Sequence, residues 1–160
     1  MTSQRDHESL RNAAKSLDVF STARVTVPLD QNGCLCTQSL NNWLSSTKQN
    51  TSIKTDPTNE TTSNILLVTT LVCGQTGAIE NLSGIHEILR KSVSRCTRHV
   101  DATQAVGKIP VSFAAINATS LTFAPHKFGG PRGIECLLVQ KTLNMRRSLQ
   151  FPTFRNSWWY

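Results

Sequence analysis

The stretch of sequence that decides the fold class is Ile65-Leu66-Leu67-Val68-Thr69-Thr70-Leu71-Val72. It is too apolar to alternate between a buried and an exposed face, which is typical of a strand buried on both faces of a parallel sheet. Shorter β-rich runs follow near residues 98–100, 121–124 and 136–140, and apolar residues at helical spacing between 85 and 93 predict a helix. Strands that alternate with helices predict an α/β protein with a mostly parallel sheet and helices on both faces.

On the N-terminal side of this strand the pattern predicts a helix over residues 7–18 and a short strand over 23–29. Thr37 is placed to cap a further short helix. Residues 45–63 are nearly all Ser, Thr, Asn, Lys and acids, and this composition predicts a polar surface loop.

The chain has 160 residues, 38% of them hydrophobic, which fits one globular domain with a core of its own. No apolar run approaches the roughly 20 residues of a membrane helix, and the polar start is unlike a secretory signal. We therefore expect a cytoplasmic protein with no membrane partner. In that compartment the five cysteines are expected to be thiols, and because only Cys34 and Cys36 lie close together, we expect no metal site.

The formal charge of +7 is unevenly placed, because no acid follows Glu135. Four basic residues come after it, namely Lys141, Arg146, Arg147 and Arg155. Such a tail is either a solvated chain end or a segment attracted to phosphate polymers. We favour the solvated end and expect no nucleic-acid partner, because the aromatic residues 158–160 lie at the terminus and outside any nucleic-acid-binding module.

Two segments combine residues that can do chemistry. They read His99-Val100-Asp101-Ala102-Thr103-Gln104-Ala105-Val106-Gly107-Lys108-Ile109-Pro110 and Phe123-Ala124-Pro125-His126-Lys127-Phe128-Gly129-Gly130-Pro131-Arg132-Gly133. Each begins at a predicted strand, so the acid Asp101 and the amine Lys127 are expected at one edge of the sheet. Ligands of open α/β sheets bind at that edge.

These two segments closely resemble the cysteine desulfurases, in the class V branch of the fold type I pyridoxal-phosphate (PLP) enzymes. The Asp6-His7-Glu8-Ser9 segment resembles a further motif of that family. The resemblance covers residues 1–142 and implies the central part of a PLP-binding large domain. Residues 143–160 diverge from it as a basic and aromatic tail.

The resemblance also implies a role for each of five side chains. Lys127 matches the catalytic lysine that bonds the cofactor aldehyde, and Asp101 matches the aspartate that pairs with the pyridine nitrogen. Gln104 matches the ligand of the phenolic oxygen, His7 the histidine stacked on the ring, and His126 a histidine near the phosphate. Outside this family, Asp101 would be expected to cap a helix that follows it.

The sequence departs from the family at positions close to the cofactor. Ala124 and Pro125 stand where the family has a phosphate-binding serine and a small residue, and Gly74 stands where it has an asparagine. The family's N-terminal phosphate-binding turn, its nucleophilic cysteine and its substrate-binding arginine match nothing in the chain. We expect a truncated copy with little activity alone, because each lost donor costs about 10²- to 10³-fold in rate.

The resemblance implies a cysteine desulfurase-like protein, in which sulfur leaves L-cysteine to give L-alanine and serves iron-sulfur cluster biosynthesis. A sulfur-acceptor protein and a homodimer are the partners it implies. Two alternatives stay open: a non-catalytic remnant or interaction protein, and another class V activity such as a selenocysteine lyase or an aminotransferase. These enzymes use the same lysine and aspartate.

Overall fold

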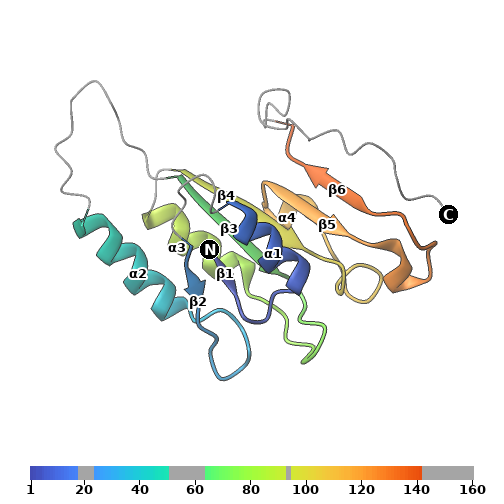
Figure 1. Ribbon diagram of the computed structural model, residues 1–160, viewed down its shortest axis with the longest axis horizontal. Coiled ribbons are helices and arrows are strands. Elements are labelled where there is room, and N and C mark those ends of the chain that lie inside the picture. The colour runs from blue at the N-terminus through green and yellow to red at the C-terminus, as the bar shows by residue number, and fades with distance from the viewer. Residues whose placement is uncertain (18–23, 51–63, 93–94, 142–160) are drawn as a thin grey trace.

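Four strands form the central sheet, in the order β3 (Asn64–Thr70), β4 (Arg95–Asp101), β5 (Ser120–Phe123) and β6 (Cys136–Val139). The computed structural model describes residues 1–17, 24–50, 64–92 and 95–141. In it β3, β4 and β5 run parallel, and β6 lies antiparallel to β5 at one edge, as Figure 1 shows. The prediction of one mostly parallel sheet is confirmed.

The strand register aligns the ends of the three parallel strands. Thr70, Asp101 and Thr122 lie side by side across β3, β4 and β5. Because successive side chains of a strand point to opposite faces, these three share one face of the sheet. The row before them, Thr69, Val100 and Leu121, belongs to the other face. One face is therefore polar near the strand ends and the other mainly apolar.

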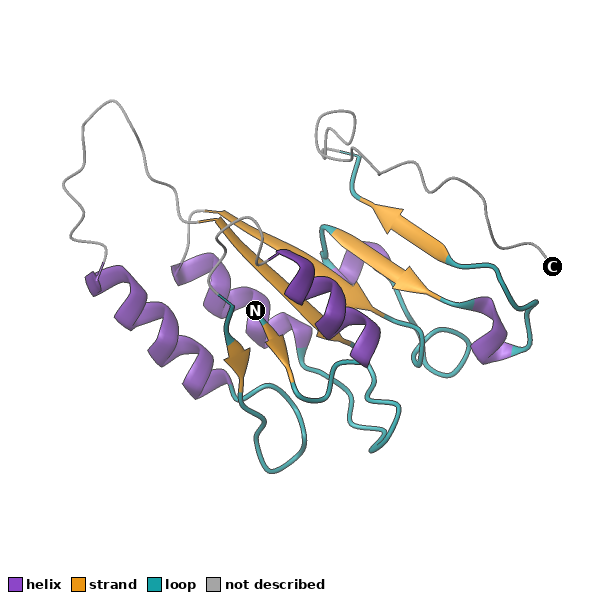
Figure 2. Cartoon of the chain, viewed as in Figure 1, coloured by secondary structure: helices purple, strands orange, loops and turns teal. Residues whose placement is uncertain are grey.

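Helices lie on both sides of the sheet. Figure 1 draws α1 (Glu8–Ser16) in front of it, and α3 (Leu82–Ser92) and α4 (Phe113–Ile116) behind it. The helix α3 connects β3 to the neighbouring parallel strand β4, and α2 (Thr37–Asn50) packs beside α3. Figure 2 shows the same layers by secondary structure.

Two clusters of buried side chains form the core. The first lies between β3 and the helices α2 and α3, and contains Val27, Leu35, Leu40, Leu44, Leu67, Ile85 and Leu89. The second lies toward the ends of β4 and β5, and contains Leu71, Val100, Ala102, Ala105, Ala118 and Leu121. Three of its six members are alanines, so large side chains fill the first cluster more than the second.

The outer edge of β3 is covered by the N-terminal segment. The N–H of Val68 donates to the carbonyl of Met1 at 3.0 Å, and the N–H of Thr70 donates to Oδ1 of Asp6 at 2.9 Å. The short strand β1 (Thr2–Ser3) lies in this segment and pairs with β2 (Thr26–Val27), which is shorter than the predicted strand over 23–29. This edge of the sheet therefore has few free backbone groups.

Two local predictions need correction. The helix α2 continues through residues 45–50, the start of the predicted loop over 45–63, because Leu40 and Leu44 pack it against the first core cluster. The hydroxyls of Ser45 and Ser46 donate to the carbonyls of Asn41 and Trp43 within the helix. The rest of that loop, residues 51–63, and the tail from residue 142 lie outside the described residues.

The second correction concerns the segment after β4, which was expected to be helical in character. Residues 103–108 form turns. Gly107 adopts a left-handed φ of 78°, which interrupts a right-handed helix. Among the described residues, no helix is long and apolar enough to cross a membrane, and no three metal-binding side chains gather.

Candidate functional site at the strand ends

Three loops meet at the carboxyl edge of the parallel strands. They follow β3 at residues 71–77, β4 at residues 102–110, and β5 at residues 124–130. The last of them contains the 3-10 helix η2 (Pro125–Phe128), which carries His126 and Lys127. The predicted site residues other than His7 therefore lie on two neighbouring strand ends.

The loops after β3 and β4 touch at Gly74 and Gln104. A Cβ atom added at Gly74 would lie 3.4 Å from both Cγ and Nε2 of Gln104. The Gln104 amide therefore lies against the backbone of Gly74. The side chain of any larger residue at position 74 would contact this amide. Oε1 of Gln104 accepts a hydrogen bond from Nζ of Lys108 at 2.6 Å.

Asp101 is the last residue of β4 and is half-buried. Its Oδ1 accepts a hydrogen bond from the N–H of Thr103 at 2.8 Å, and its carbonyl accepts one from the N–H of Leu71 at 2.8 Å. The first bond belongs to an Asp turn, since no helix follows. The carboxylate is thus fixed at the strand end, next to the loop after β3.

The loops after β4 and β5 are in close contact through Gly107 and Phe128. A Cβ atom added at Gly107 would lie 2.5 Å from the Cβ of Phe128, so only glycine permits this approach. The Phe128 ring also lies 6.2 Å from the ring of Phe123 on β5, centroid to centroid. The Gly107 contact fixes the residue next to Lys127 against the loop after β4, and the Phe123 contact fixes it against β5.

Lys127 itself is exposed. Its backbone N–H donates to the carbonyl of Ala124 at 3.1 Å, and its ammonium makes no hydrogen bond or ion pair with the residues the structure describes. His126 is exposed beside it. The amine is therefore available to a ligand.

His7 approaches the same edge from the N-terminal segment. It is the N-cap of α1, with its Nδ1 2.8 Å from Oγ of Ser9, and it is exposed. Its neighbour Asp6 is buried and accepts hydrogen bonds at Oδ2 from the N–H and the hydroxyl of Ser3, at 2.6 and 3.0 Å. Because Oδ1 of Asp6 binds Thr70 at the end of β3, His7 is tethered to that strand end.

A buried ion pair supports the loop after β3. Arg5 Nη1 lies 3.0 Å from Oε2 of Glu80, and the two side chains are 2% and 1% exposed. Arg5 also donates to the carbonyls of Gly33, Thr70 and Ala78. Burial raises the pKa of Glu80, against the N–H of Leu35 and the charge of Arg5, which lower it.

Arg5, Glu80 and His99 were not among the predicted site residues. His99 lies on the same face as Asp101, with Nδ1 2.9 Å from Oγ of Ser120 and Nε2 3.3 Å from Oγ1 of Thr122. Burial lowers the pKa of His99, although the Asp101 carboxylate opposes this. Hydroxyls at alternate positions of β5 were the signal in the sequence for a polar face there.

Among the described residues, no hydrogen bond joins any two of His7, Asp101, Gln104, His126 and Lys127. Asp101 ends β4 and Gln104 lies on the loop after it, whereas His126 and Lys127 lie on the adjoining loop after β5. Their convergence on one ligand stays a prediction.

The residues present fit the ring and the aldehyde of pyridoxal phosphate better than its phosphate. An amine, a carboxylate and an amide stand on adjoining loops, and these are the groups that the ring substituents require. At the phosphate position, Ala124 is buried and supplies no polar side-chain atom, and Pro125 supplies no N–H. The N–H of Lys127 already donates a hydrogen bond to the carbonyl of Ala124.

Comparison with known proteins adds family evidence to this geometry. The sequence pattern of the family described as "Aminotransferase class-V" matches residues 1–151. Two curated relatives are cysteine desulfurases IscS. The one from Aeromonas hydrophila is 37% identical over 79 residues, which are 49% of this chain and 19% of the relative. The one from Glaesserella parasuis is 39% identical over 82 residues, which are 51% of this chain and 20% of the relative.

Solved structures show the same fold. A "NIFS-like protein" superposes with a TM-score of 0.71 at 23% identity, covering 88% of this chain and 34% of that protein. A second structure, "SspA in complex with cysteine", gives a TM-score of 0.68 at 20% identity, covering 89% of this chain and 36% of its own. The matched part is about a fifth of the length of the two curated relatives.

Proposed function

Because the chain belongs to the class-V aminotransferase family, we propose that it binds pyridoxal phosphate at the carboxyl edge of β3, β4 and β5, as a cysteine desulfurase-like protein with little turnover alone. The observation that carries this proposal is the contact between Gly107 and Phe128. It joins the loop of Asp101 and Gln104 to the loop of Lys127. A carboxylate and a free amine thereby share one edge of the sheet.

The proposal assigns one part of the cofactor to each side chain. Lys127 would hold the aldehyde, Asp101 the ring nitrogen, Gln104 the phenolic oxygen, His7 the ring face and His126 the phosphate. The contact of Gln104 with Gly74 supports its place, because the amide lies beside the loop after β3. The tether of Asp6 to Thr70 supports the place of His7.

When bound, pyridoxal phosphate supplies an electron sink for chemistry at the substrate α-carbon. The Asp101 carboxylate would keep a proton on the ring nitrogen, since an adjacent negative charge favours the protonated form. The Lys127 amine, which has no partner among the described residues, would accept and return the α-proton of the substrate. The half-buried position of Asp101 limits the water that competes for its charge.

Low turnover follows from what surrounds these groups. Gly74 offers no amide, and Ala124 offers no hydroxyl. Each missing donor costs about 10²- to 10³-fold in rate. Cys73 is the thiol nearest in sequence to Gly74, and it is buried, so it is not free to reach a substrate sulfur.

The names of the relatives suggest the substrate class. L-cysteine is the proposed amino acid, with a sulfur-acceptor protein as partner in the cytoplasm. A non-catalytic PLP-binding protein is the second candidate, and the side chains absent at Gly74 and Ala124 favour it. Selenocysteine lyase or aminotransferase chemistry would use the same lysine and aspartate.

Cofactor binding is tested by titrating the purified chain with pyridoxal phosphate, reducing the adduct with borohydride and mapping the modified lysine by mass spectrometry. We expect a visible absorbance band and modification of Lys127. Lys127→Ala should lose both, whereas the control Lys91→Ala, on α3, should keep them. Modification spread evenly over the lysines, or a band unchanged in Lys127→Ala, contradicts the proposal.

Catalysis is tested by measuring alanine and sulfide released from L-cysteine at equal cofactor concentration. We expect the chain alone to release neither above the rate of free pyridoxal phosphate. Multiple turnovers that depend on Lys127 would show that the proposed loss of activity is wrong. The same assay with selenocysteine, and with a keto-acid acceptor, separates the other class V activities.

A further inference from the structure

Two buried hydroxyls at the end of β3 lack a hydrogen-bond partner. Oγ1 of Thr69 and Oγ1 of Thr70 bond to none of the residues that the structure describes, although the two residues are only 1% and 5% exposed. Most buried side-chain polar atoms have a partner, and an unsatisfied hydroxyl destabilises the folded chain. Because neighbours along a strand point to opposite faces of the sheet, the two hydroxyls have different surroundings.

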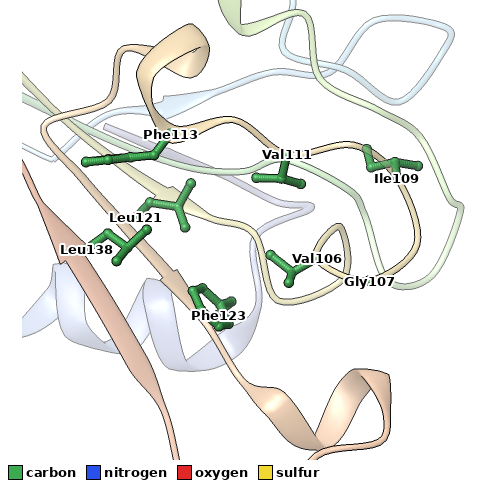
Figure 3. Close-up of a pocket in the computed structure, with 8 residues that line it drawn as sticks. All are labelled: Val106, Gly107, Ile109, Val111, Phe113, Leu121, Phe123 and Leu138. Carbon is green, nitrogen blue, oxygen red and sulfur yellow. The ribbon is translucent and has the colours of Figure 1, made fainter.

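The face of Thr69 is apolar. Its row across the sheet continues with Val100 and Leu121, which belong to the second core cluster. Leu121 also lines an apolar pocket of about 250 Å³, and Figure 3 shows that the labelled side chains around this pocket are aliphatic or aromatic. None of these side chains offers the Thr69 hydroxyl an acceptor.

The face of Thr70 is polar. Its row continues with Asp101 and Thr122. Oδ1 of Asp101 accepts the hydrogen bond from the N–H of Thr103 at 2.8 Å, and among the described residues no donor bonds to its Oδ2. A donor without an acceptor and an acceptor atom without a donor therefore occupy paired positions of adjacent strands.

The geometry of the sheet lets these two groups meet. Neighbouring strands lie about 4.8 Å apart, so side chains at paired positions on one face stand side by side. The backbone of Thr70 is fixed, because its N–H donates to Asp6 and its carbonyl accepts from Arg5. Rotation about the Cα–Cβ bond exchanges the hydroxyl with a methyl group of similar size, so the hydroxyl can turn toward β4 within the same volume.

We propose that Thr70 is a positioning residue of the candidate site, whose hydroxyl donates to Oδ2 of Asp101. With the N–H of Thr103, it gives each carboxylate oxygen one donor and leaves each oxygen a lone pair for a ligand. A carboxylate fixed in this way needs little reorganisation when it binds the ring nitrogen. The role toward the cofactor rests on the proposed function, whereas the hydrogen bond itself does not.

The first test is a double-mutant cycle on the cofactor-free chain, measured by urea unfolding. Thr70→Val keeps the shape of the side chain and removes its hydroxyl. We expect this change to lower the folding equilibrium constant about tenfold, the effect of losing a hydrogen bond to a charged group. In the Asp101→Ala background the same change should not lower it, because the acceptor is already absent.

Thr69→Val is the matched control, because it removes the other unsatisfied hydroxyl from the neighbouring residue. It should leave the folding equilibrium constant unchanged or raise it, and equally so in both backgrounds. If Thr70→Val behaves like Thr69→Val, the Thr70 hydroxyl has no acceptor and the proposal is wrong. Equal effects of Thr70→Val with and without the Asp101 carboxylate overturn it as well.

The second test measures the affinity for pyridoxal phosphate from the visible absorbance band. Thr70→Val should weaken binding about fivefold, because the carboxylate loses one of the two donors that orient it. Borohydride should still attach the cofactor to Lys127 in this variant. Thr70→Ser keeps the hydroxyl and should restore the affinity, which a role in packing alone does not predict. Thr69→Val should bind like the wild-type chain.

The two tests distinguish failure of this inference from failure of the proposed function. Coupling between Thr70 and Asp101 in a wild-type chain that shows no visible band would confirm the hydrogen bond but overturn the proposed function, and with it the role of Thr70 toward the cofactor. Full affinity in Thr70→Val, or weakened binding that Thr70→Ser does not restore, overturns the positioning role. Circular dichroism of each variant checks that the fold is retained.

Discussion

The two edge strands of the sheet, β3 and β6, differ in how their outer edges are covered. At β3, the segment from Met1 to Asp6 covers the backbone, and Arg5 and Glu80 form a buried ion pair next to it. At β6, apolar side chains remain exposed on both faces. The core beneath follows the same division, because leucines fill the cluster near β3 and alanines make up half of the cluster near β5.

This difference shows that stability and chemistry are concentrated in different places. The buried ion pair fixes the loop after β3, whereas the free amine of Lys127 lies on the loop after β5, where packing is more open. A ligand binds polar side chains most readily where these side chains have no hydrogen-bond or ionic partner within the chain. The candidate site therefore lies at the boundary between the tightly packed and the open half.

The largest effect is expected where the ion pair is broken. Arg5→Met leaves the Glu80 carboxylate buried without its counter-charge, and removes donors from the carbonyls of Gly33, Thr70 and Ala78. We expect a loss of about 3–5 kcal/mol in the free energy of unfolding. Urea titration measures it. Arg11→Met, on the exposed surface of α1, is the matched control and should cost less than about 0.5 kcal/mol. Equal losses would mean that the pair does not stabilise this edge.

The second prediction compares the two core regions through leucines. Leu67 on β3 is 1% exposed and lies in the cluster with α2 and α3, so Leu67→Ala should cost about 2–5 kcal/mol. Leu138→Ala on β6 should cost less than about 1 kcal/mol, because solvent already reaches that side chain. Chemical denaturation of both variants checks this. Similar costs would contradict the division into a tight and an open half.

The sheet could be predicted from the sequence because its signals are local. The apolar run from Ile65 to Val72 contains enough information to identify a buried strand, and the neighbouring runs gave the remaining strands. The ion pair could not be predicted, because Arg5 and Glu80 are 75 positions apart and each is ordinarily a surface residue. Only the folded chain brings them together.

Prediction of the candidate site from the sequence is limited in the same way. The family resemblance named Asp101 and Lys127, but it did not show that Gly107 and Phe128 join their loops. The left-handed φ of Gly107 interrupts the helical pattern after Asp101, and the polar residues 45–50 extend a helix whose Leu40 and Leu44 are buried in the core. In both cases backbone conformation or core packing outweighed local composition.

The third prediction tests the contact between Gly107 and Phe128, which joins the loops after β4 and β5. Gly107→Ala introduces both a strained positive φ and a clash with Phe128, whereas Gly133→Ala introduces the same kind of φ strain with nothing within 4 Å. Gly133→Ala should cost about 1 kcal/mol, and Gly107→Ala about 1–3 kcal/mol more because of overpacking. Unfolding free energies measure the difference. Gly107→Ala should also weaken the visible band of bound pyridoxal phosphate, which Gly133→Ala should leave in place. Equal behaviour of the two variants would mean that the Phe128 contact does not fix the Lys127 loop.

The smallest effect concerns His99, on the polar face between the two edges. Burial lowers the pKa of His99 in the folded chain, so the unfolded chain binds this proton more readily, with a pKa near 6.5. The stability that neutral His99 contributes is therefore present above about pH 6.5 and is lost as pH falls through the lowered folded pKa.

His99→Gln keeps polar atoms facing Ser120 and Thr122 but does not titrate. We expect the stability advantage of the wild-type chain over His99→Gln to decrease from pH 7.5 to pH 5.5, measured by urea unfolding at each pH. His86, whose pKa is also lowered by burial and by Arg98, titrates in both chains and cancels from the difference. A difference that stays constant with pH would show that His99 is as solvated in the folded chain as in the unfolded one, and that the polar face is open to water like the edge of β6.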